Sequence, residues 1–309
     1  MSDKTSNSIP PQHARAVIIG GGVSGCSVAY HLAKRGWTDI VLLERKQLTC
    51  GTTWHAAGLI GQLRSSQNLT RLARYSAELY QQLEAETGIA TGMRVTGSIS
   101  AALTDARMEE LRRQASLAKA FSVEAEEIDL AEMKRLYPHI NTDGMVGGVY
   151  LPGDGQCDPA NIAMALAKGA RQMGARIIEG VKVTGVTQAG GRVSGVNWQV
   201  DEAGAENTGY IASDIVINCA GMWARDFAAS AGVTLPLHAC EHFYIVTESI
   251  AELGKLPVLR VPDECAYYKE DAGKLMLGAF EPKAKPWGMD GIPEDFCFDQ
   301  LPEDFEHFE

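Results

Sequence analysis

The sequence lacks any long hydrophobic stretch. Its apolar runs are short, such as residues 16–19 and 215–217, whereas a membrane-spanning helix needs about 20 apolar residues. Basic residues are also scarce, because 28 Lys and Arg stand against 39 Asp and Glu and give a net charge of −11. A surface that binds a phosphate backbone is therefore not expected. These two absences argue against membrane insertion and against nucleic acid as a partner.

Cysteines with metal-binding or redox spacing are absent as well. The seven cysteines are scattered and odd in number, and no two form C-x-x-C, which argues against a disulfide framework and a zinc site. We expect reduced thiols, a cytoplasmic location and no metal. Residues 1–13 have neither the apolar core of a signal peptide nor an arginine-rich transit pattern, so they are interpreted as a disordered lead-in.

A glycine-rich turn follows the first predicted strand. Residues 14–19 form a β-branched run, and the glycines of a G-x-G-x-x-G motif follow at Gly20, Gly22 and Gly25. A helix is predicted at 26–35, and a second strand is predicted at 39–44 with the acid Glu44 at its end. This is the order of a dinucleotide-binding βαβ unit, whose glycines allow a tight turn, backbone approach to a pyrophosphate and close helix packing. The helix N-terminus favours the pyrophosphate. Glu44 would accept hydrogen bonds from ribose hydroxyls, which favours FAD or NAD over NADP.

The chain does not continue with the βα units of a nicotinamide dehydrogenase. A loop of small residues surrounds Trp54 and His55, and residues 181–186 and 193–200 alternate as a hairpin around a Gly-Gly turn. A buried strand is predicted at 214–219. Two-domain FAD enzymes typically contain a βαβ unit, then an antiparallel hairpin, and then a strand that returns to the first sheet. We therefore predict an α/β protein.

Five segments carry a resemblance to a known family. GGGVSG, ERKQLTCGTTWHAAG, LPGDGQCDPANI, DIVINCAGMWA and EHFYIVTE resemble segments of the sarcosine and dimethylglycine dehydrogenases, which are D-amino-acid-oxidase-like flavoenzymes. The resemblance implies a Rossmann-like FAD-binding domain interleaved with an antiparallel-sheet substrate domain. The FAD-binding domain is expected to comprise residues 14–92 and 152–235. The substrate domain is expected to comprise residues 93–151 and 236–309, and it is expected to be incomplete at its C-terminal end.

His55 is the most specific residue that the resemblance implies. In the family, the histidine of G-T-T-W-H-A-A-G bonds covalently to FAD, which needs a neutral imidazole and would raise the reduction potential of the flavin. A histidine that hydrogen-bonds backbone in a loop is the alternative. The further residues expected to bind FAD come from the glycine turn, the loop and the later strands: Gly20, Gly22, Val23, Ser24, Gly25, Glu44, Arg45, Thr52, Thr53, Ala57, Val183, Ala220, Gly221 and Trp223.

The resemblance also implies two substrate residues. His242, in an H-x-Y-[VI]-V-T-E run, would lie over the flavin. Tyr267 would contact the substrate, with Tyr268 as the alternative, because only one of two neighbours on a strand can face the flavin. A His–Tyr cross-strand pair without function is the competing interpretation. Arg64 could meet a substrate carboxylate, but a solvated arginine at the start of a helix is the preferred interpretation.

The implied reaction is oxidative demethylation of a small N-methylated amino acid, sarcosine or dimethylglycine, by hydride transfer to a covalent flavin. Electrons would pass to an electron-transfer flavoprotein. Tetrahydrofolate would enter only if a folate-binding domain follows at the C-terminus, as in the family. Two alternatives stay open, namely an amine oxidase that uses O₂ on another secondary or tertiary amine, and a non-catalytic regulatory relative with the same fold.

The remaining pattern predicts regular elements and their caps. Helices are expected at 66–87, 105–121, 130–136 and 159–173, and strands at 97–103 and 146–151. In the first helix, Leu69, Leu72, Leu79 and Leu83 are predicted to lie in the core. Residues 286–309 contain eight acidic residues and no Lys or Arg, and this acidic end is predicted to be a solvated surface.

Overall fold

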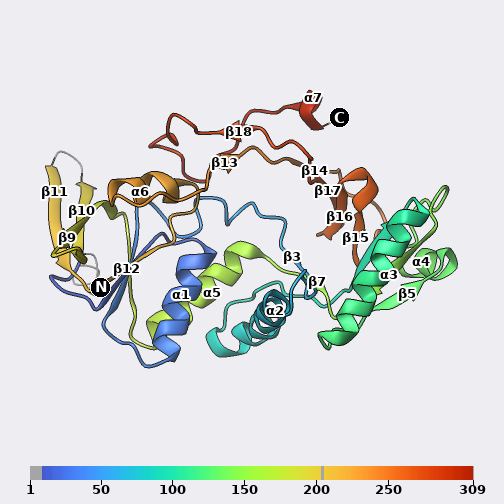
Figure 1. Cartoon of the computed structure of the whole chain (residues 1–309), viewed down its shortest axis with the longest axis horizontal. Coiled ribbons are helices and arrows are strands. Elements are labelled where there is room, and N and C mark those ends of the chain that lie inside the picture. Colours follow the sequence, from blue (N-terminus) through green and yellow to red (C-terminus); the bar gives the residue numbers. More distant parts are fainter. Residues whose placement is uncertain (1–8, 203–204, 309) are drawn as a thin grey trace.

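The computed structural model describes residues 9–202 and 205–308. A parallel sheet lies toward one end of an elongated molecule and a mostly antiparallel sheet toward the other, and the C-terminal segment crosses above both (Figure 1). Residues 1–8 of the predicted lead-in lie outside the described residues, and at its end the Gln12 carbonyl accepts a hydrogen bond from Ala212 N. None of the helices in the described part is long and apolar enough to cross a membrane.

The parallel sheet has the strand order β12-β1-β2-β8. Its strands are β1 (Ala16–Ile19), β2 (Ile40–Glu44), β8 (Arg176–Glu179) and β12 (Ile215–Asn218). Alternate residues of β1 face opposite sides, so Ala16 and Ile18 pack on the helices α1 (Val23–Lys34) and α5 (Pro159–Gln172). Val17 and Ile19 instead pack on a second sheet. The parallel sheet is therefore covered on both faces.

The second sheet is an antiparallel hairpin with one added strand. It has the order β11-β10-β9, with β9 (Lys182–Ala189), β10 (Arg192–Glu202) and β11 (Ala205–Ala212). The predicted hairpin is confirmed, whereas β11 was missed. The strand predicted at 214–219 is confirmed as β12. Its predicted burial is wrong, because β12 lies at the edge of the parallel sheet and leaves Ile215 36% exposed.

The antiparallel layer is a seven-stranded sheet of order β14-β17-β16-β15-β4-β6-β5. Its strands are β4 (Ser98–Ala102), β5 (Glu126–Ile128), β6 (Gly147–Leu151), β14 (Tyr244–Val246), β15 (Val258–Val261), β16 (Ala266–Asp271) and β17 (Lys274–Ala279). Neighbours run antiparallel except for β15 and β4. Apolar residues of this sheet pack against α3 (Asp105–Ala120) and α4 (Leu130–Leu136). The opposite side of its β14–β15 half faces the site described below.

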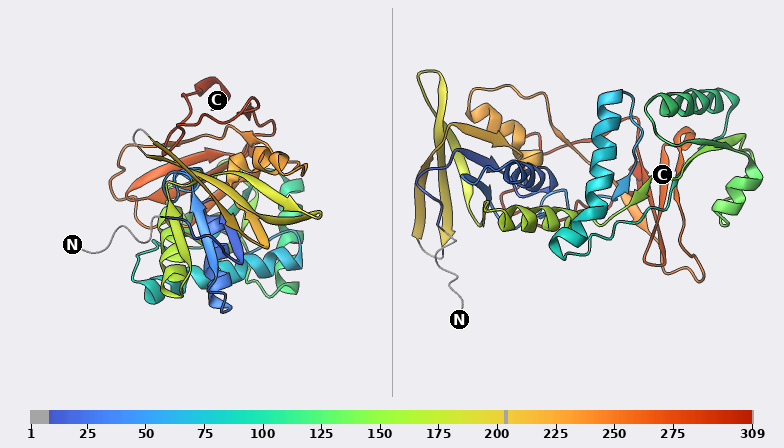
Figure 2. Two further views of the ribbon diagram at one scale, coloured as in Figure 1. Left: turned by 90° about the vertical axis from the view of Figure 1, so that its left-hand side faces the viewer. Right: turned by 90° about the horizontal axis from the view of Figure 1, so that it is seen from below.

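Helix α2 (Gln67–Thr87) stands between the two layers (Figures 1 and 2). It begins after Ser66, whose side chain accepts a hydrogen bond from Leu69 N, and ends at Gly88 in the left-handed conformation. Leu79 and Leu83 are buried, as predicted. The core prediction is wrong for Leu69 and Leu72, which are 51% and 60% exposed, because helical spacing does not reveal where the first turns leave the core.

Short elements complete the chain. They are β3 (Leu59–Ile60), β7 (Gly155–Gln156), α6 (Ala224–Ser230), β13 (Ala239–Cys240), β18 (Pro286–Trp287), α7 (Phe305–Phe308) and two 3₁₀ turns at Gly221–Trp223 and Pro262–Glu264. Strand β13 pairs with β18, so two segments separated by more than 40 residues cross the molecule side by side. These segments form a cover over the space between the layers (Figure 1).

Candidate functional site

The glycine turn places the N-terminus of α1 at the carboxyl end of the parallel sheet. Gly20 has a φ of +104°, and a Cβ on Gly25 would lie 1.9 Å from the Gly20 carbonyl oxygen, so both positions require glycine. Helix α1 begins at Gly22 without a side-chain cap on that residue. The first helical N–H, of Val23, donates to Thr53 Oγ1 at 3.0 Å. The positive end of the helix faces a cavity, because Gly22, Val23 and Ser24 line that cavity.

A cavity of about 780 Å³, here named the loop cavity, opens in front of this turn. It is lined by twelve of the residues predicted to bind FAD: Gly20, Gly22, Val23, Ser24, Glu44, Arg45, Thr52, Thr53, Val183, Ala220, Gly221 and Trp223. Gly25 packs beneath the turn and does not line the cavity. One cavity is thus surrounded by a glycine turn, by a helix N-terminus whose first N–H is bound by Thr53 and by a terminal acid on β2. This arrangement suits a dinucleotide. The residues present therefore fit the predicted cofactor.

Glu44 closes the base of the turn. Its Oε2 accepts a hydrogen bond from Gly21 N at 2.7 Å and its Oε1 accepts one from Lys46 N at 2.9 Å. The side chain is buried, and burial raises the pKa of its carboxyl group, opposed by these two N–H donors. A carboxylate has about four acceptor sites, so Glu44 retains capacity for ribose hydroxyls.

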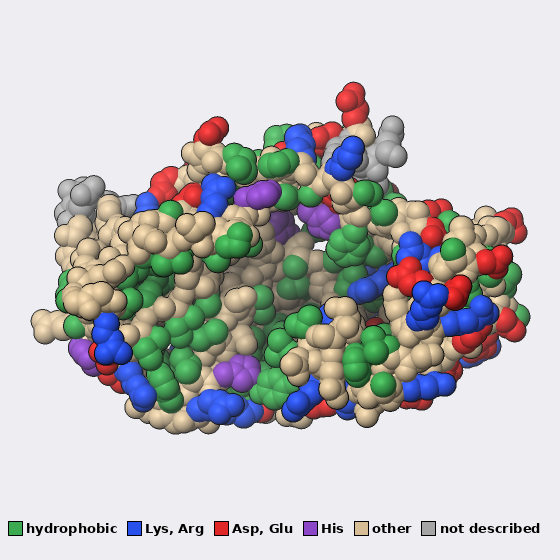
Figure 3. Space-filling model, in the orientation of Figure 1, with side chains coloured by type: hydrophobic (Ala, Val, Ile, Leu, Met, Phe, Trp, Pro, Cys, Tyr) green, Lys and Arg blue, Asp and Glu red, His purple; other side chains and the backbone are tan. Residues whose placement is uncertain are grey.

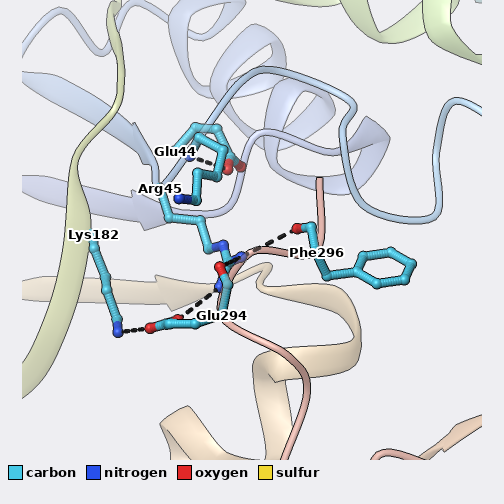
Figure 4. A network of polar contacts seen from close by, with 6 residues as sticks. Glu44, Arg45, Lys182, Glu294 and Phe296 are labelled. Atoms are coloured by element: carbon cyan, nitrogen blue, oxygen red, sulfur yellow. Dashed lines mark hydrogen bonds and ion pairs between the residues drawn. The ribbon is translucent and has the colours of Figure 1, made fainter. Parts of the chain in front are cut away.

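Arg45 binds the C-terminal segment (Figure 4). Its guanidinium donates to the backbone carbonyls of Glu294 and Phe296, at 2.6 and 3.1 Å, and lies 3.3 Å from the Glu294 carboxylate. Lys182 forms an ion pair with the same carboxylate. The Glu294 side chain is 64% exposed, as predicted for a solvated acidic end, and it also lines the loop cavity between the two cations.

His55 lies in the loop that follows Thr53 and is half-buried. Its ring is stacked on Trp54, with centroids 4.8 Å apart, and burial lowers its pKa from 6.5. The imidazole is therefore neutral at pH 7. The loop ends at Gly58, whose φ is +71° and where a Cβ would lie 2.2 Å from the Cys157 carbonyl oxygen, so its sharp exit requires glycine.

His55 lines a second cavity of about 900 Å³, here named the sheet cavity, over the β14–β15 half of the seven-stranded sheet. Ala57, His242 and Tyr267 line the same cavity. The two cavities adjoin, because four residues line both: Thr52, Gly221, Met222 and Leu237. Figure 3 shows the molecule hollowed beneath the C-terminal segment, with histidine side chains at the rim. The fold thus brings together residues that are more than 200 positions apart.

The wall of the sheet cavity contains a row of residues in register. Arg260 lies opposite Tyr267, Tyr267 opposite Gly278, and Gly278 opposite Tyr244 on successive strands. Residues directly opposite one another point to the same face. The ring of Tyr267 fits over Gly278, where a Cβ would lie 2.1 Å from Cζ. Tyr268 points to the other face and packs in the core there, so Tyr267 is the tyrosine that faces the cavity.

His242 and Tyr267 contact the same phenylalanine. The ring centroid of Phe280 lies 5.5 Å from that of His242 and 5.1 Å from that of Tyr267. His242 Nδ1 lies 3.2 Å from Glu281 Oε2, which fixes the ring orientation. Tyr267 is 2% exposed, and burial raises its pKa to about 12. Its hydroxyl therefore keeps its proton at neutral pH and can donate a hydrogen bond.

Arg260 is a charged cavity residue that the sequence interpretation missed. It interrupts the apolar strand β15, in which Val258, Leu259 and Val261 are buried. Its guanidinium faces the sheet cavity, and burial lowers its pKa. A charged residue inside an apolar strand is the signal that could have identified it, because such a residue is rarely buried without a partner.

Similarity to known proteins shows the family to which this chain belongs. A sequence model of the family described as FAD dependent oxidoreductase matches residues 15–307. The chain belongs to this family. It is 37% identical over its whole length to 4-methylaminobutanoate oxidase (formaldehyde-forming) of Paenarthrobacter nicotinovorans, of which it covers 36%. It is 40% identical to mitochondrial sarcosine dehydrogenase of Homo sapiens, over 96% of the chain and 32% of that protein.

The solved structure of L-proline dehydrogenase from P. horikoshii matches 97% of this FAD-dependent chain and 75% of that one, with a TM-score of 0.81 and 24% identity. The predicted resemblance and the D-amino-acid-oxidase-like FAD-binding fold are confirmed. The chain spans about a third of the length of the two curated relatives described. Across the described ranges, no group of three or more His, Cys, Asp or Glu side chains is placed to hold a metal ion.

Proposed function

We propose that this chain carries the flavin site of an enzyme that oxidises the N-methyl group of a small N-methylated amino acid, with FAD linked covalently to His55. One observation carries the proposal. His55, His242 and Tyr267 line one cavity, and that cavity adjoins the loop cavity that fits a dinucleotide. The names of the two curated relatives, a sarcosine dehydrogenase and a methylaminobutanoate oxidase, support an N-methylated substrate.

The loop cavity would hold the dinucleotide part of FAD. The α1 N-terminus and the backbone at Gly22 would bind the pyrophosphate, where Thr53 Oγ1 already lies within hydrogen-bond distance of Val23 N. Glu44 would accept from the ribose hydroxyls. When bound, FAD supplies the hydride acceptor. A neutral His55 is suited to covalent attachment, because its imidazole nitrogen carries a free lone pair.

The residues of the sheet cavity would prepare the amine. A protonated amine has no lone pair with which to expel a hydride, so the substrate must lose its ammonium proton before oxidation. His242 would accept this proton, and its contact with Glu281 orients the ring. Tyr267 would donate a hydrogen bond from its un-ionised hydroxyl and so position the substrate. Electrons would then leave to an electron-transfer flavoprotein.

The proposal is tested by amine oxidation with the FAD-loaded protein. Sarcosine and dimethylglycine should reduce an artificial electron acceptor and release formaldehyde, with little oxygen uptake. Oxygen uptake at the same rate would favour an oxidase. A protein that binds flavin but oxidises no N-methyl amine would contradict the proposal and would favour the non-catalytic relative.

The role of His242 is tested by substitution. His242→Asn should lower kcat about 100-fold, the lower end of what a general base contributes, and should remove one limb of the pH profile. The matched control is His139→Asn, because His139 lies on an exposed turn outside both cavities. An unchanged pH profile in His242→Asn would contradict the assignment.

A further inference from the structure

Two cysteines lie next to each other where the C-terminal segment meets the loop that carries His55, here named the His55 loop (residues 45–58). Cys50 belongs to this loop, is 3% exposed and lines the loop cavity. Cys297 belongs to the C-terminal segment and is partly exposed. Both are free thiols. The two cysteines are far apart in the sequence, so the fold alone brings them together.

The backbones of the two segments are joined on both sides of Cys297. Phe298 N donates a hydrogen bond to the Cys50 carbonyl oxygen at 3.0 Å, and the Phe296 carbonyl oxygen accepts one from the Arg45 guanidinium at 3.1 Å. Residues that face each other across backbone hydrogen bonds have Cα atoms about 5.5 Å apart, and a disulfide needs Cα atoms about 4.4–6.8 Å apart. Cys297 directly precedes the donor of the first bond, so a disulfide with Cys50 requires little movement of the backbone.

The two thiols differ in their environments. Burial, the Glu44 carboxylate and the contact with the Cys297 thiol raise the pKa of Cys50 to about 11. Cys50 therefore keeps its proton at neutral pH and is a poor first nucleophile, because the thiolate is the reactive form. Cys297 is the more exposed of the two, so an oxidant that arrives from solvent meets Cys297 first.

We propose that Cys50 and Cys297 form a modification site, at which a hydroperoxide ties the C-terminal segment to the His55 loop through a reversible disulfide. With hydrogen peroxide, the sulfur of Cys297 attacks the O–O bond, becomes a sulfenic acid and releases water. The sulfur of Cys50 then attacks the sulfenic acid, so that the S–S bond forms and a second water leaves with the Cys50 proton. Two electrons pass from the two thiols to one peroxide, which is reduced to two waters.

The disulfide would fix the C-terminal segment over both cavities (Figure 1). Cys50 lines the loop cavity, and Phe296, which directly precedes Cys297, lines the sheet cavity. In the reduced protein the segment is held here by non-covalent contacts, among them the exposed ion pairs of Glu294, which contribute little. Oxidation would thus tie down a segment that otherwise can lift, and it would restrict entry to both cavities. This inference goes beyond the proposed function and does not depend on amine turnover.

The test treats the full chain with hydrogen peroxide, alkylates the remaining thiols under denaturing conditions and digests the protein without reductant. Mass spectrometry should find the Cys50 and Cys297 peptides joined, with a mass two hydrogen atoms below their sum. Dithiothreitol should separate them again. Cys297→Ser should abolish the joined peptide. The matched control Cys240→Ser, which removes an exposed cysteine, should leave it intact.

Cys50→Ser separates the two steps of the reaction. Without the second thiol, Cys297 should stop at the sulfenic acid, which dimedone traps, or proceed to the sulfinic acid. Cys297 is partly exposed, so Cys297→Ser keeps the test decisive where the buried Cys50→Ser does not fold. A wild-type protein in which both thiols are still alkylated after peroxide, or in which Cys50 is joined to a different cysteine, would overturn the inference.

Limited proteolysis tests the effect on the C-terminal segment. Cleavage within residues 286–300 should slow about 10-fold or more in the oxidised wild type, because cleavage of a folded segment follows how often it opens. Dithiothreitol should restore the original rate, and Cys297→Ser should be cleaved equally fast with and without peroxide. A joined wild-type protein that is cleaved at the rate of the reduced protein would overturn the restriction of entry.

Discussion

Gly278→Ala tests the geometry of the cavity wall. An alanine Cβ at this position would lie 2.1 Å from Tyr267 Cζ and 2.2 Å from its hydroxyl oxygen, whereas ordinary contact begins at 3.4 Å. Tyr267 is 2% exposed and its ring lies against Phe280. The ring must therefore either strain the buried strand or turn into the sheet cavity.

The expected cost follows from these two responses. Overpacking of a core typically costs about 1–3 kcal/mol, and the reduced freedom of the unfolded chain on replacing glycine returns less than about 1 kcal/mol. A net loss of about 1–2 kcal/mol in the free energy of unfolding is expected if the ring stays in place. If the ring turns instead, stability changes less and the binding of trimethylglycine, an N-methylated amino acid that cannot be oxidised, falls, because the ring then occupies the substrate space.

The assay combines urea unfolding with trimethylglycine calorimetry on the same protein. The matched control is Gly185→Ala in strand β9, where a Cβ would meet nothing within 4 Å and where we expect a neutral or slightly stabilising effect. A Gly278→Ala protein that unfolds at the wild-type urea concentration and also binds trimethylglycine as wild type does would refute the described packing of Tyr267.

Two further predictions concern the C-terminal segment and His55. Glu294→Gln should remove the ion pairs with Arg45 and Lys182; because Glu294 is exposed, each is worth at most about 1 kcal/mol. At low salt, proteolysis within residues 286–300 should be faster in Glu294→Gln than in the wild type, and at high salt the two rates should converge. The control variant Asp290→Asn should be cleaved at the wild-type rate. Equal rates for all three proteins at low salt would contradict the role of Glu294. Burial lowers the pKa of His55 below its unfolded value of 6.5. The unfolded state therefore binds more protons than the folded state when the pH falls below 6.5. In that pH range the flavin-free wild type should lose stability relative to His55→Gln. Parallel stability curves from pH 5 to 8 would contradict a lowered pKa.

The local parts of the fold were accessible from the sequence. Ser66, Thr104 and Asp158 each cap the N-terminus of a helix by accepting a hydrogen bond from a backbone N–H three residues ahead, and helix starts were predicted at these positions. The glycines of the turn were identified for the same reason, since φ and close packing restrict those positions whatever lies farther away. Such features depend on interactions over a few residues, which a sequence displays directly.

The long-range parts of the site were not accessible in this way. Arg260 faces the cavity because β15 lies beside β16 in one particular register, and a shift of one residue would turn it to the other face. Glu294 binds Arg45 across 249 positions, and no local pattern indicates that contact. Leu69 and Leu72 follow the same helical spacing as Leu79 and Leu83, yet only the packing of α2 against its neighbours decides which pair is buried. The missing information is therefore the register and contact of distant segments.

The covalent flavin is the central claim, and one measurement tests it most directly. The FAD-loaded protein is denatured, freed of small molecules and digested, and the peptides are examined by absorbance and mass. The account predicts flavin absorbance on the peptide that contains His55, with the added mass of FAD, and its loss in His55→Ala. Flavin that separates completely from the denatured wild-type protein, or flavin that stays attached in His55→Ala, would contradict the claim.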